Sequence, residues 1–585
     1  MKELQYLNKY FAKYKFQLLL GIVITVVSQL FSLFTPSEIG DSVSAIEKYS
    51  KGELGADGVK AVLFTSIMII LGATLIKGIL TFFMRQTLIV MSRHIEFDLK
   101  NEIFRHYENL SQSFYKRNRT GDLMNRISED VNKVRQYVGP AIMYALNMLI
   151  LFIVILTQMI LISPKLTLYT IVPLPLLAYS IFWVSKEINR RSTLTQQNLS
   201  RLSTFSQEMF SGIRVTKAYA LEGQKENGFT SLSRENKKMN MSLAFVNALF
   251  GPLMVLLIGI SNLVVILVGG NMYVNGTIPD IGTIAEFILY INMLTWPVAS
   301  LGWISGMVQE AEASQKRINE FLKTEPDIQN NAPEQTAILG NIVFDNVSFT
   351  YEDTNIEALK NVSFSLNKGE TLAILGRTGS GKSTLLSLIS RLYDTTSGTV
   401  TIDGENVKDV NLYGLRNSIG FVPQDAFLFS DSIKNNIRFG KEDATDDEVV
   451  QVSKKAAVHH NIESFTHQYE TILGERGITL SGGQKQRVSI ARAMIKNAPI
   501  LLLDDCLSAV DTETEETILN NLRDFCRDKT TIIVSHRVSS AKNADTILIL
   551  EDGKIVEQGT HNQLIAKNGY YKELYMLQLA EKEIL

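Results

Sequence analysis

The sequence predicts an all-α transmembrane domain of six helices, followed by an α/β domain. Two observations lead to this fold class. The N-terminal half contains six apolar segments near the ~20 residues that a membrane-spanning helix needs. Beyond residue 338 the chain changes to short apolar runs typical of buried strands. One of these runs, Thr371–Leu375, leads through a glycine-rich loop into a helical pattern.

The six apolar segments differ in how clearly their sequences predict a membrane-spanning helix. The third and fourth are joined only by the short sequence SPK around Pro164, so they predict a tight hairpin. The sixth is interrupted by polar residues and a proline, among them Glu286, which we interpret either as a substrate contact or as a group near the outer rim. The segments are Phe16–Phe34, Lys60–Met84, Val138–Ile162, Leu166–Val184, Val246–Val268 and Ile281–Ser305.

Basic residues predict the orientation of these spans. The stretches 92–135 and 186–242 hold about nine and about ten lysines and arginines, whereas the first loop between spans is acidic. Because basic loops stay in the cytoplasm, both chain termini are expected there. The two basic stretches have helical periodicity but are too polar to span a membrane, so they predict cytoplasmic extensions of the helices.

Composition bounds the remaining classes of function. The formal net charge is −2, which provides no overall basic field for a nucleic-acid partner. Two cysteines among 585 residues offer neither a disulfide framework nor a metal site.

The change from long apolar segments to short strand-like runs sets the expected domain boundaries. We expect a transmembrane domain in contact with membrane lipid at 1–324, a polar linker at 325–338 and a second domain at 339–585.

The loop Gly376–Thr384, GRTGSGKST, has the spacing G-x-x-x-x-G-K-[ST] of a phosphate-binding loop. Its glycines let backbone N–H groups surround phosphate oxygens, while Lys382 adds a charge for the β- and γ-phosphates and Ser383 offers a hydroxyl to Mg²⁺. The helix that follows directs its N-terminus at the anion. The predicted nucleotide ligands are Gly376, Arg377, Thr378, Gly379, Ser380, Gly381, Lys382, Ser383 and Thr384.

Two later apolar runs end in polar residues suited to the same chemistry. LLLDDC, Leu501–Cys506, ends in two carboxylates, and a carboxylate at the tip of a buried parallel strand is where Mg²⁺ is organised in phosphate-loop folds. TIIVSHR, Thr531–Arg537, is a similar strand with His536 near its end.

The string LSGGQ at Leu480–Gln484, about a hundred residues after the loop, completes a pattern that resembles the ATP-binding cassette (ABC) ATPases. FVPQ at 421–424 is similar to the family's Q-loop, SAVD at 508–511 to its D-loop, and Tyr351 to the aromatic residue that stacks on adenine. The resemblance covers essentially all of 340–585. It implies ATP and Mg²⁺ as cofactors and a dimer in which LSGGQ faces an ATP held by the second cassette. It assigns nucleotide contacts also to Tyr351, Ser481, Gly482, Gly483, Gln484 and Asp511, metal contacts to Ser383, Gln424 and Asp504, and catalysis to Asp505, His536 and Gln424.

The N-terminal half extends the resemblance to ABC exporters. Residues 113–131 and 211–222 are similar to the family's two intracellular connections, whose short helices dock on the ATPase domain. The resemblance implies a multi-pass half-transporter in a bacterial inner membrane, with its ATPase domain in the cytoplasm. Two such chains, paired as a homodimer or a heterodimer, would export a drug, lipid, peptide or other small molecule. An ATP-gated channel or regulator on the same fold is the alternative.

One position departs from the family pattern. Most active cassettes have Asp followed by Glu at the end of the Walker B strand, whereas this chain has Asp504 followed by Asp505. The shorter side chain withdraws the carboxylate from the attacking water. We therefore predict a slow ATP site in a chain that pairs with a different subunit. The alternative is a homodimer with two Asp-containing sites.

Overall fold

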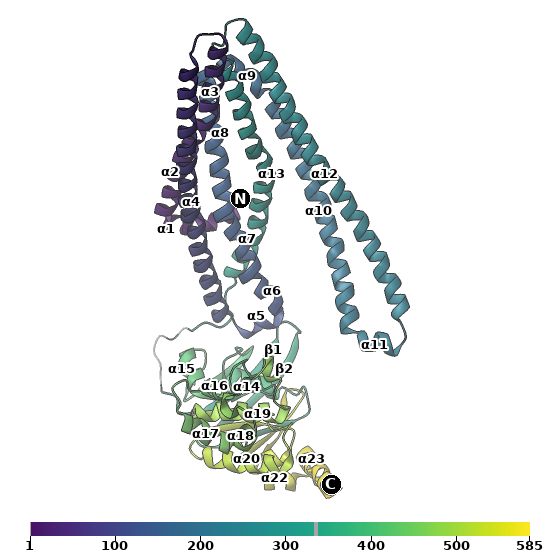
Figure 1. Ribbon diagram of the computed structural model, residues 1–585. Helices are drawn as coiled ribbons and strands as arrows, with labels where there is room; N and C mark the ends of the chain where they lie inside the picture. Colours follow the sequence, from purple (N-terminus) through teal and green to yellow (C-terminus); the bar gives the residue numbers. More distant parts are fainter. Residues whose placement is uncertain (1, 331, 333–336, 585) are drawn as a thin grey trace. The chain divides into compact units, whose positions relative to one another are not determined.

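Chain packing divides the protein into two units. The first comprises Met1–Glu108 and Gly121–Thr324, and the second comprises Asn109–Thr120 and Glu325–Leu585. The structure, a computed structural model, describes residues 2–330, 332 and 337–584 (Figure 1). Residues 331 and 333–336 of the predicted linker lie outside the described residues.

The first unit is built from long helices. Its main elements are α2 (Lys15–Leu30), α3 (Phe34–Ser50), α4 (Ala56–Asn109), α8 (Ile142–Ile162), α9 (Pro164–Ile171), α10 (Pro173–Ser211), α11 (Ile213–Ala218), α12 (Glu222–Val274) and α13 (Gly282–Leu322). At 1.5 Å per residue α4 is about 80 Å long, far more than a hydrocarbon core of about 30 Å. The basic stretch 186–242 is helical through the ends of α10 and α12, as its periodicity predicted.

Within the described residues, five helical stretches are long and apolar enough to cross a membrane. They contain the first, second, third and fifth predicted segments, and all of the sixth except its first residue, Ile281. The fourth predicted segment is instead divided between α9 and α10 at Val172. Val172 itself keeps helical dihedrals (φ −51°, ψ −40°), so α10 continues the course of α9, and Pro173 removes only one N–H from the hydrogen-bond ladder. The five stretches are Lys15–Ser50, Ala56–Asn109, Thr120–Ile162, Glu222–Val274 and Gly282–Leu322.

Helix packing in the first unit uses small residues and polar pairs. A Cβ on Gly282 of α13 would lie 2.0 Å from the Gly40 carbonyl oxygen of α3, so these helices approach at backbone distance. Near this crossing, Glu286 is buried and accepts a hydrogen bond of 2.6 Å from the Tyr290 hydroxyl of its own helix. α10 and α12 lie side by side and are joined by α11 (Figure 1).

Two sheets form the framework of the second unit. The antiparallel sheet has the order β2-β1-β4-β5, and the larger sheet has the order β10-β9-β3-β8-β7-β6. In the larger sheet only β10 runs antiparallel to its neighbour. The strands are β1 (Ile342–Tyr351), β2 (Ile356–Leu366), β3 (Thr371–Gly376), β4 (Ser397–Ile402), β5 (Glu405–Asn406), β6 (Ile419–Val422), β7 (Ile500–Asp504), β8 (Thr530–Val534), β9 (Thr546–Glu551) and β10 (Lys554–Gly559).

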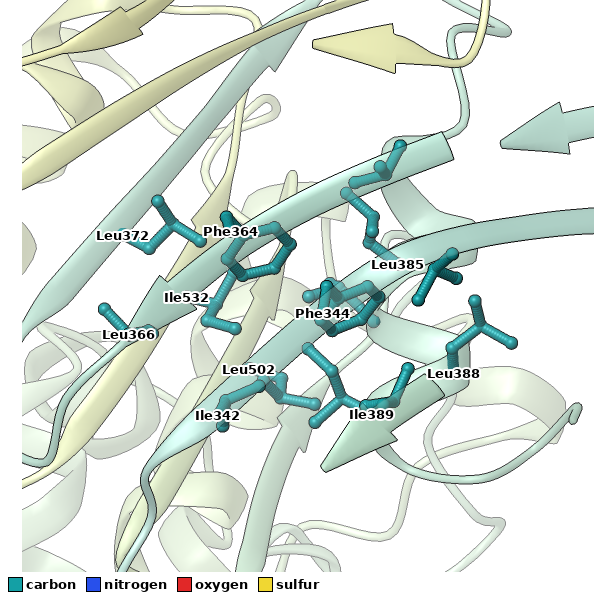
Figure 2. Close-up of a cluster of buried hydrophobic side chains, with 14 of the residues drawn as sticks. Ile342, Phe344, Phe364, Leu366, Leu372, Leu385, Leu388, Ile389, Leu502 and Ile532 are labelled. Atoms are coloured by element: carbon teal, nitrogen blue, oxygen red, sulfur yellow. The ribbon is translucent and has the colours of Figure 1, made fainter. Parts of the chain in front are cut away.

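The main core of this unit lies between the two sheets and α14 (Lys382–Ile389). Figure 2 shows side chains from both sheets and from α14 meeting there, with Phe344 and Phe364 stacked at 4.6 Å between ring centroids. β7 is buried at every position, as expected for a central parallel strand. The other helices are α5 (Gln112–Arg117), α15 (Leu412–Asn417), α16 (Ile433–Arg438), α17 (Asp446–Lys455), α18 (His459–Glu463), α19 (Gly482–Ile495), α20 (Thr512–Phe525), α21 (Val538–Ala541), α22 (His561–Lys567) and α23 (Tyr570–Ile584).

Candidate functional site

The order of the parallel strands brings four predicted motifs to one edge of the sheet. β3, β8, β7 and β6 are successive neighbours and run parallel, so their carboxyl ends lie together. The phosphate loop follows β3 and His536 follows β8. Asp504 is the last residue of β7, and Gln424 comes two residues after β6. Ligands of open α/β sheets bind outside such an edge.

Three glycines of the phosphate loop have a positive φ, and at two of them a side chain would also collide with a neighbouring strand. Gly376 has φ +153° and Gly381 has φ +98°, both in the region that disfavours side chains. A Cβ at Gly376 would lie 2.1 Å from the Leu550 carbonyl oxygen, and one at Gly381 would lie 2.3 Å from the Ala358 carbonyl oxygen. The loop is therefore held between β9 and β2, with its backbone N–H groups at the start of α14.

Lys382 is the buried cation of this loop, whereas Arg377 is exposed. Its ammonium donates hydrogen bonds to the carbonyl oxygens of Gly376 (2.9 Å) and Arg377 (2.8 Å), which holds it across the loop. Burial lowers the pKa of Lys382, and the nearby Asp505 and Asp504 carboxylates oppose this effect. A buried ammonium that faces carbonyl oxygens and carboxylates is placed to exchange these partners for phosphate oxygens.

The β7 carboxylates differ in surroundings. Asp504 is buried and accepts a hydrogen bond of 3.0 Å from the Ser383 hydroxyl. Burial raises its pKa, while Ser383, Lys382 and His536 act in the opposite direction. Asp505 has φ +43°, and its backbone N–H donates to the Val534 carbonyl oxygen at 2.9 Å. This bond fixes the start of its side chain beside β8.

Tyr351 ends β1 beside α14. Its hydroxyl lies 3.0 Å from the Thr384 hydroxyl, and its ring meets Phe349 edge-on at 4.8 Å. Tyr393 packs edge-on at 5.5 Å. These contacts fix the ring close to the C-terminal side of the phosphate loop.

The LSGGQ string starts α19 and packs on the D-loop. The Ser481 hydroxyl accepts from the Gln484 N–H (3.3 Å), and the Gln484 side chain accepts from the Ser481 N–H (3.0 Å), which makes a reciprocal cap. A Cβ at Gly483 would lie 2.6 Å from the Ala509 carbonyl oxygen. Ser481 and Gly482 are exposed. The D-loop ends at Asp511, which caps α20 by accepting from the Thr514 N–H at 2.9 Å.

Sequence reasoning missed a buried carboxylate that joins the D-loop side to the His536 side. Glu515 of α20 is 1% exposed and pairs with Arg537, the residue after His536. It also accepts hydrogen bonds from Ser539 (2.8 Å) and Ser540 (3.0 Å). Glu515 lies four residues after the D-loop and belongs to no motif. Its partners are 22 to 25 residues away, so no local sequence pattern indicates the pairing.

Comparison with known families agrees with this arrangement. Residues 18–298 match the family described as ABC transporter transmembrane region, and residues 359–508 match the family described as ABC transporter.

The chain belongs to the ABC transporter family.

Relatives of this transporter are similar along nearly their whole length. "Probable multidrug resistance ABC transporter ATP-binding/permease protein YheI" of Bacillus subtilis is 36% identical over 98% of this chain and 97% of its own. The "Multidrug resistance-like ATP-binding protein MdlA" of Escherichia coli is 33% identical over 98% and 96%. The "ATP-dependent lipid A-core flippase" of Syntrophus aciditrophicus is 35% identical over 87% and 85%.

A solved structure has the same fold. A bacterial Atm1-family ABC exporter with ATP bound is 26% identical, with a TM-score of 0.81 over 97% of this chain and 99% of that one. The transporter is thus a multi-pass membrane protein of the exporter type, with its ABC domain fused to its membrane domain. It binds nucleotide and couples ATP hydrolysis to transport. The expectations for fold class and enzyme class are confirmed.

Proposed function

We propose that this transporter is one half of a heterodimeric exporter and carries the slower of its two ATP sites. The observation that carries this proposal is Asp505, which stands after β7 where most active members of the family have Glu. Its backbone is tied to Val534 of β8, so the shorter side chain has little freedom to make up the missing length.

Each residue of the site has a proposed role. Tyr351 stacks on adenine, and the loop 376–384 surrounds the phosphates, with Lys382 exchanging its two carbonyl partners for phosphate oxygens. Asp505, Gln424 and His536 orient and activate the attacking water. The residues Ser481, Gly482, Gly483, Gln484 and Asp511 act on ATP held by the partner cassette.

Ser383 at the start of α14 and Asp504 at the end of β7 fit a magnesium ion. Mg²⁺ prefers hydroxyl, carbonyl and carboxylate oxygens, and the Ser383 hydroxyl and the Asp504 carboxylate lie 3.0 Å apart at the edge of the sheet. Gln424, which is exposed, supplies a third oxygen from the neighbouring strand end. When bound, Mg²⁺ neutralises charge that develops on the phosphate oxygens.

The proposed cargo is a drug-like or lipid-like molecule, because relatives that match most of the chain are named for multidrug resistance and for a lipid A-core flippase. The proposed location is a bacterial inner membrane, with the ATPase domain in the cytoplasm. The partner is a second ABC half-transporter. The alternative assembly is a homodimer with two Asp505 sites. The alternative activity is that of an ATP-gated channel.

Purification of the native complex tests the proposal. Mass spectrometry of the complex captured through a tag on this chain should identify a second, different half-transporter in equal amount. ATP-dependent flux of a dye or a fluorescent lipid in proteoliposomes should stop when the γ-phosphate cannot be cleaved. A complex containing this chain alone would refute the heterodimer, and flux that persists with a non-hydrolysable analogue would favour the channel.

A further inference from the structure

Tyr351 belongs to an aromatic cluster whose third member comes after α14. Phe349 and Tyr393 lie 5.4 Å apart between ring centroids, and each also packs against Tyr351. The Tyr351 hydroxyl is held 3.0 Å from Thr384. Phe349 is buried, whereas Tyr351 and Tyr393 are part-exposed, so these two rings offer the surface on which the proposed adenine would stack.

A lysine from a distant part of the sequence faces this cluster. The Lys116 ammonium of α5 lies 4.6 Å from the ring centroid of Tyr351 and 5.0 Å from that of Tyr393. Both distances are within the roughly 6 Å over which a cation is attracted to a ring. Burial lowers the pKa of Lys116, but Tyr393 and Asp353 outweigh it and the pKa is raised, so the ammonium remains charged.

Other contacts hold α5 at this position. Arg117 pairs with Glu352, the residue after Tyr351, at 2.9 Å. The Ser111 hydroxyl donates to Asp327 at 2.9 Å. The segment Asn109–Thr120 accordingly packs as part of the second unit, although its two ends continue into the helices of the membrane unit. The contacts of Ser111 and Arg117 therefore hold the backbone of α5, and with it Lys116, next to the aromatic cluster.

A cavity of about 370 Å³ opens beside the same rings. That volume lies in the range of small-molecule sites, about 300–1,000 Å³. Its lining combines the rings with Lys116, Asp353, Asn355 and Thr396. A planar base stacked on the cluster would have polar groups and a fixed cation at its border.

We propose that Lys116 is a positioning residue for the adenine base, acting through Tyr351, and that it links base occupancy to the segment between two membrane helices. The inference rests on the proposed function, since it needs adenine on Tyr351. A ring already oriented by a cation loses less freedom when a base stacks on it, which strengthens binding. The attraction is modest at an exposed site, so a neutral side chain should weaken base binding about two- to fivefold.

The test compares Lys116→Met, which keeps the length of the side chain, with Lys116→Arg, which keeps the cation. Lys368→Met, at an exposed lysine between β2 and β3, is the matched control. In the purified full complex, this chain is photolabelled with 8-azido-ATP. The concentration of ATP, or of inorganic tripolyphosphate, that halves the labelling is then measured. For Lys116→Met, competition by ATP should weaken about two- to fivefold, while tripolyphosphate stays unchanged. Lys116→Arg and Lys368→Met should stay near wild type.

Tyr351→Ala separates the inference from the proposed site. It should weaken ATP competition, and Lys116→Met should add nothing in that background. If Tyr351→Ala weakens ATP but Lys116→Met does not, the role of Lys116 is wrong and the base site stands. If Tyr351→Ala has no effect, the adenine assignment itself is wrong. Equal losses for ATP and tripolyphosphate in Lys116→Met would mean that the cassette is distorted, and would overturn the positioning role.

Discussion

Replacing Asp505 by Glu isolates one methylene at the site of ATP hydrolysis. The residue already has φ +43°, in the left-handed region, and its backbone N–H is bonded to the Val534 carbonyl oxygen at 2.9 Å. Aspartate tolerates this conformation better than glutamate, so the substitution carries a small backbone cost. Because the strand end is fixed, the main effect is that the carboxylate moves outward by one carbon–carbon bond, about 1.5 Å.

The size of the effect follows from that displacement. Misplacing a reacting group by about 1 Å can cost about a hundredfold in rate, and a positioned general base contributes about 10²–10⁴-fold. Asp505→Glu should therefore raise hydrolysis at this chain's site by about tenfold or more. Nucleotide affinity should change little, since Lys382 and the phosphate loop are untouched.

Release of labelled phosphate from the purified complex, with the partner's site silenced by substitution of its phosphate-loop lysine, measures this site alone. Asp505→Asn, which keeps the shape and removes the base, is the matched control. In the heterodimer with both sites active, Asp505→Asn should leave total turnover nearly unchanged. An unaltered rate in Asp505→Glu would refute the distance argument. Abolished turnover in Asp505→Asn, in a complex shown to contain only this chain, would refute the heterodimer.

Three further substitutions test other parts of the site. Lys382→Ala removes the loop's buried cation and should weaken ATP binding at this site at least about tenfold in equilibrium titrations; unchanged affinity contradicts its role. Ser481→Arg should nearly abolish turnover of the complex. ATP binding by the full chain purified without its partner should stay within about twofold, although the substitution removes a helix cap of about 1 kcal/mol. Lost ATP binding in that single chain would mean that LSGGQ acts in cis. Glu515→Gln weakens the buried pair with Arg537. With the partner's site silenced, it should lower kcat at this chain's site about tenfold with an unchanged KM for ATP, whereas exposed Glu516→Gln should have no effect; an unchanged kcat at this site would exclude a link from α20 to His536.

Much of the site is predictable because each motif is local. The phosphate loop needs a strand, glycines and a helix start within about 20 residues, and its spacing follows from backbone geometry that the structure reproduces at Gly376 and Gly381. Glu515 was not predicted because it belongs to no motif. Lys116 lies in 113–131, which resembles an intracellular connection, but that resemblance does not say which residue Lys116 faces. Lys116 is 235 residues from Tyr351, and a single lysine on a polar helix carries no signal of what it faces.

In the membrane unit, too, some features could be predicted from the sequence and others could not. Apolar length alone identified five spans, because a bilayer sets the length of any helix that crosses it. The fourth predicted segment is helical on both sides of Val172, whose own dihedrals are helical; hydropathy does not register the N–H that Pro173 lacks there.

The sequence by itself determined the family, the fold class and the residues at each strand end, because composition and short-range spacing encode them. Tertiary structure decided which of these ends meet. The strand order β9-β3-β8-β7-β6 differs from the chain order, since crossovers and not sequence adjacency set the neighbours of a parallel strand. That order places Gln424, Asp504 and His536 at one edge with the phosphate loop. The resemblance of 113–131 to an intracellular connection predicted docking on the ATPase domain, but packing decided the partners, because the contacts of Asn109–Thr120 with Glu352 and Asp327 join residues more than 200 positions apart.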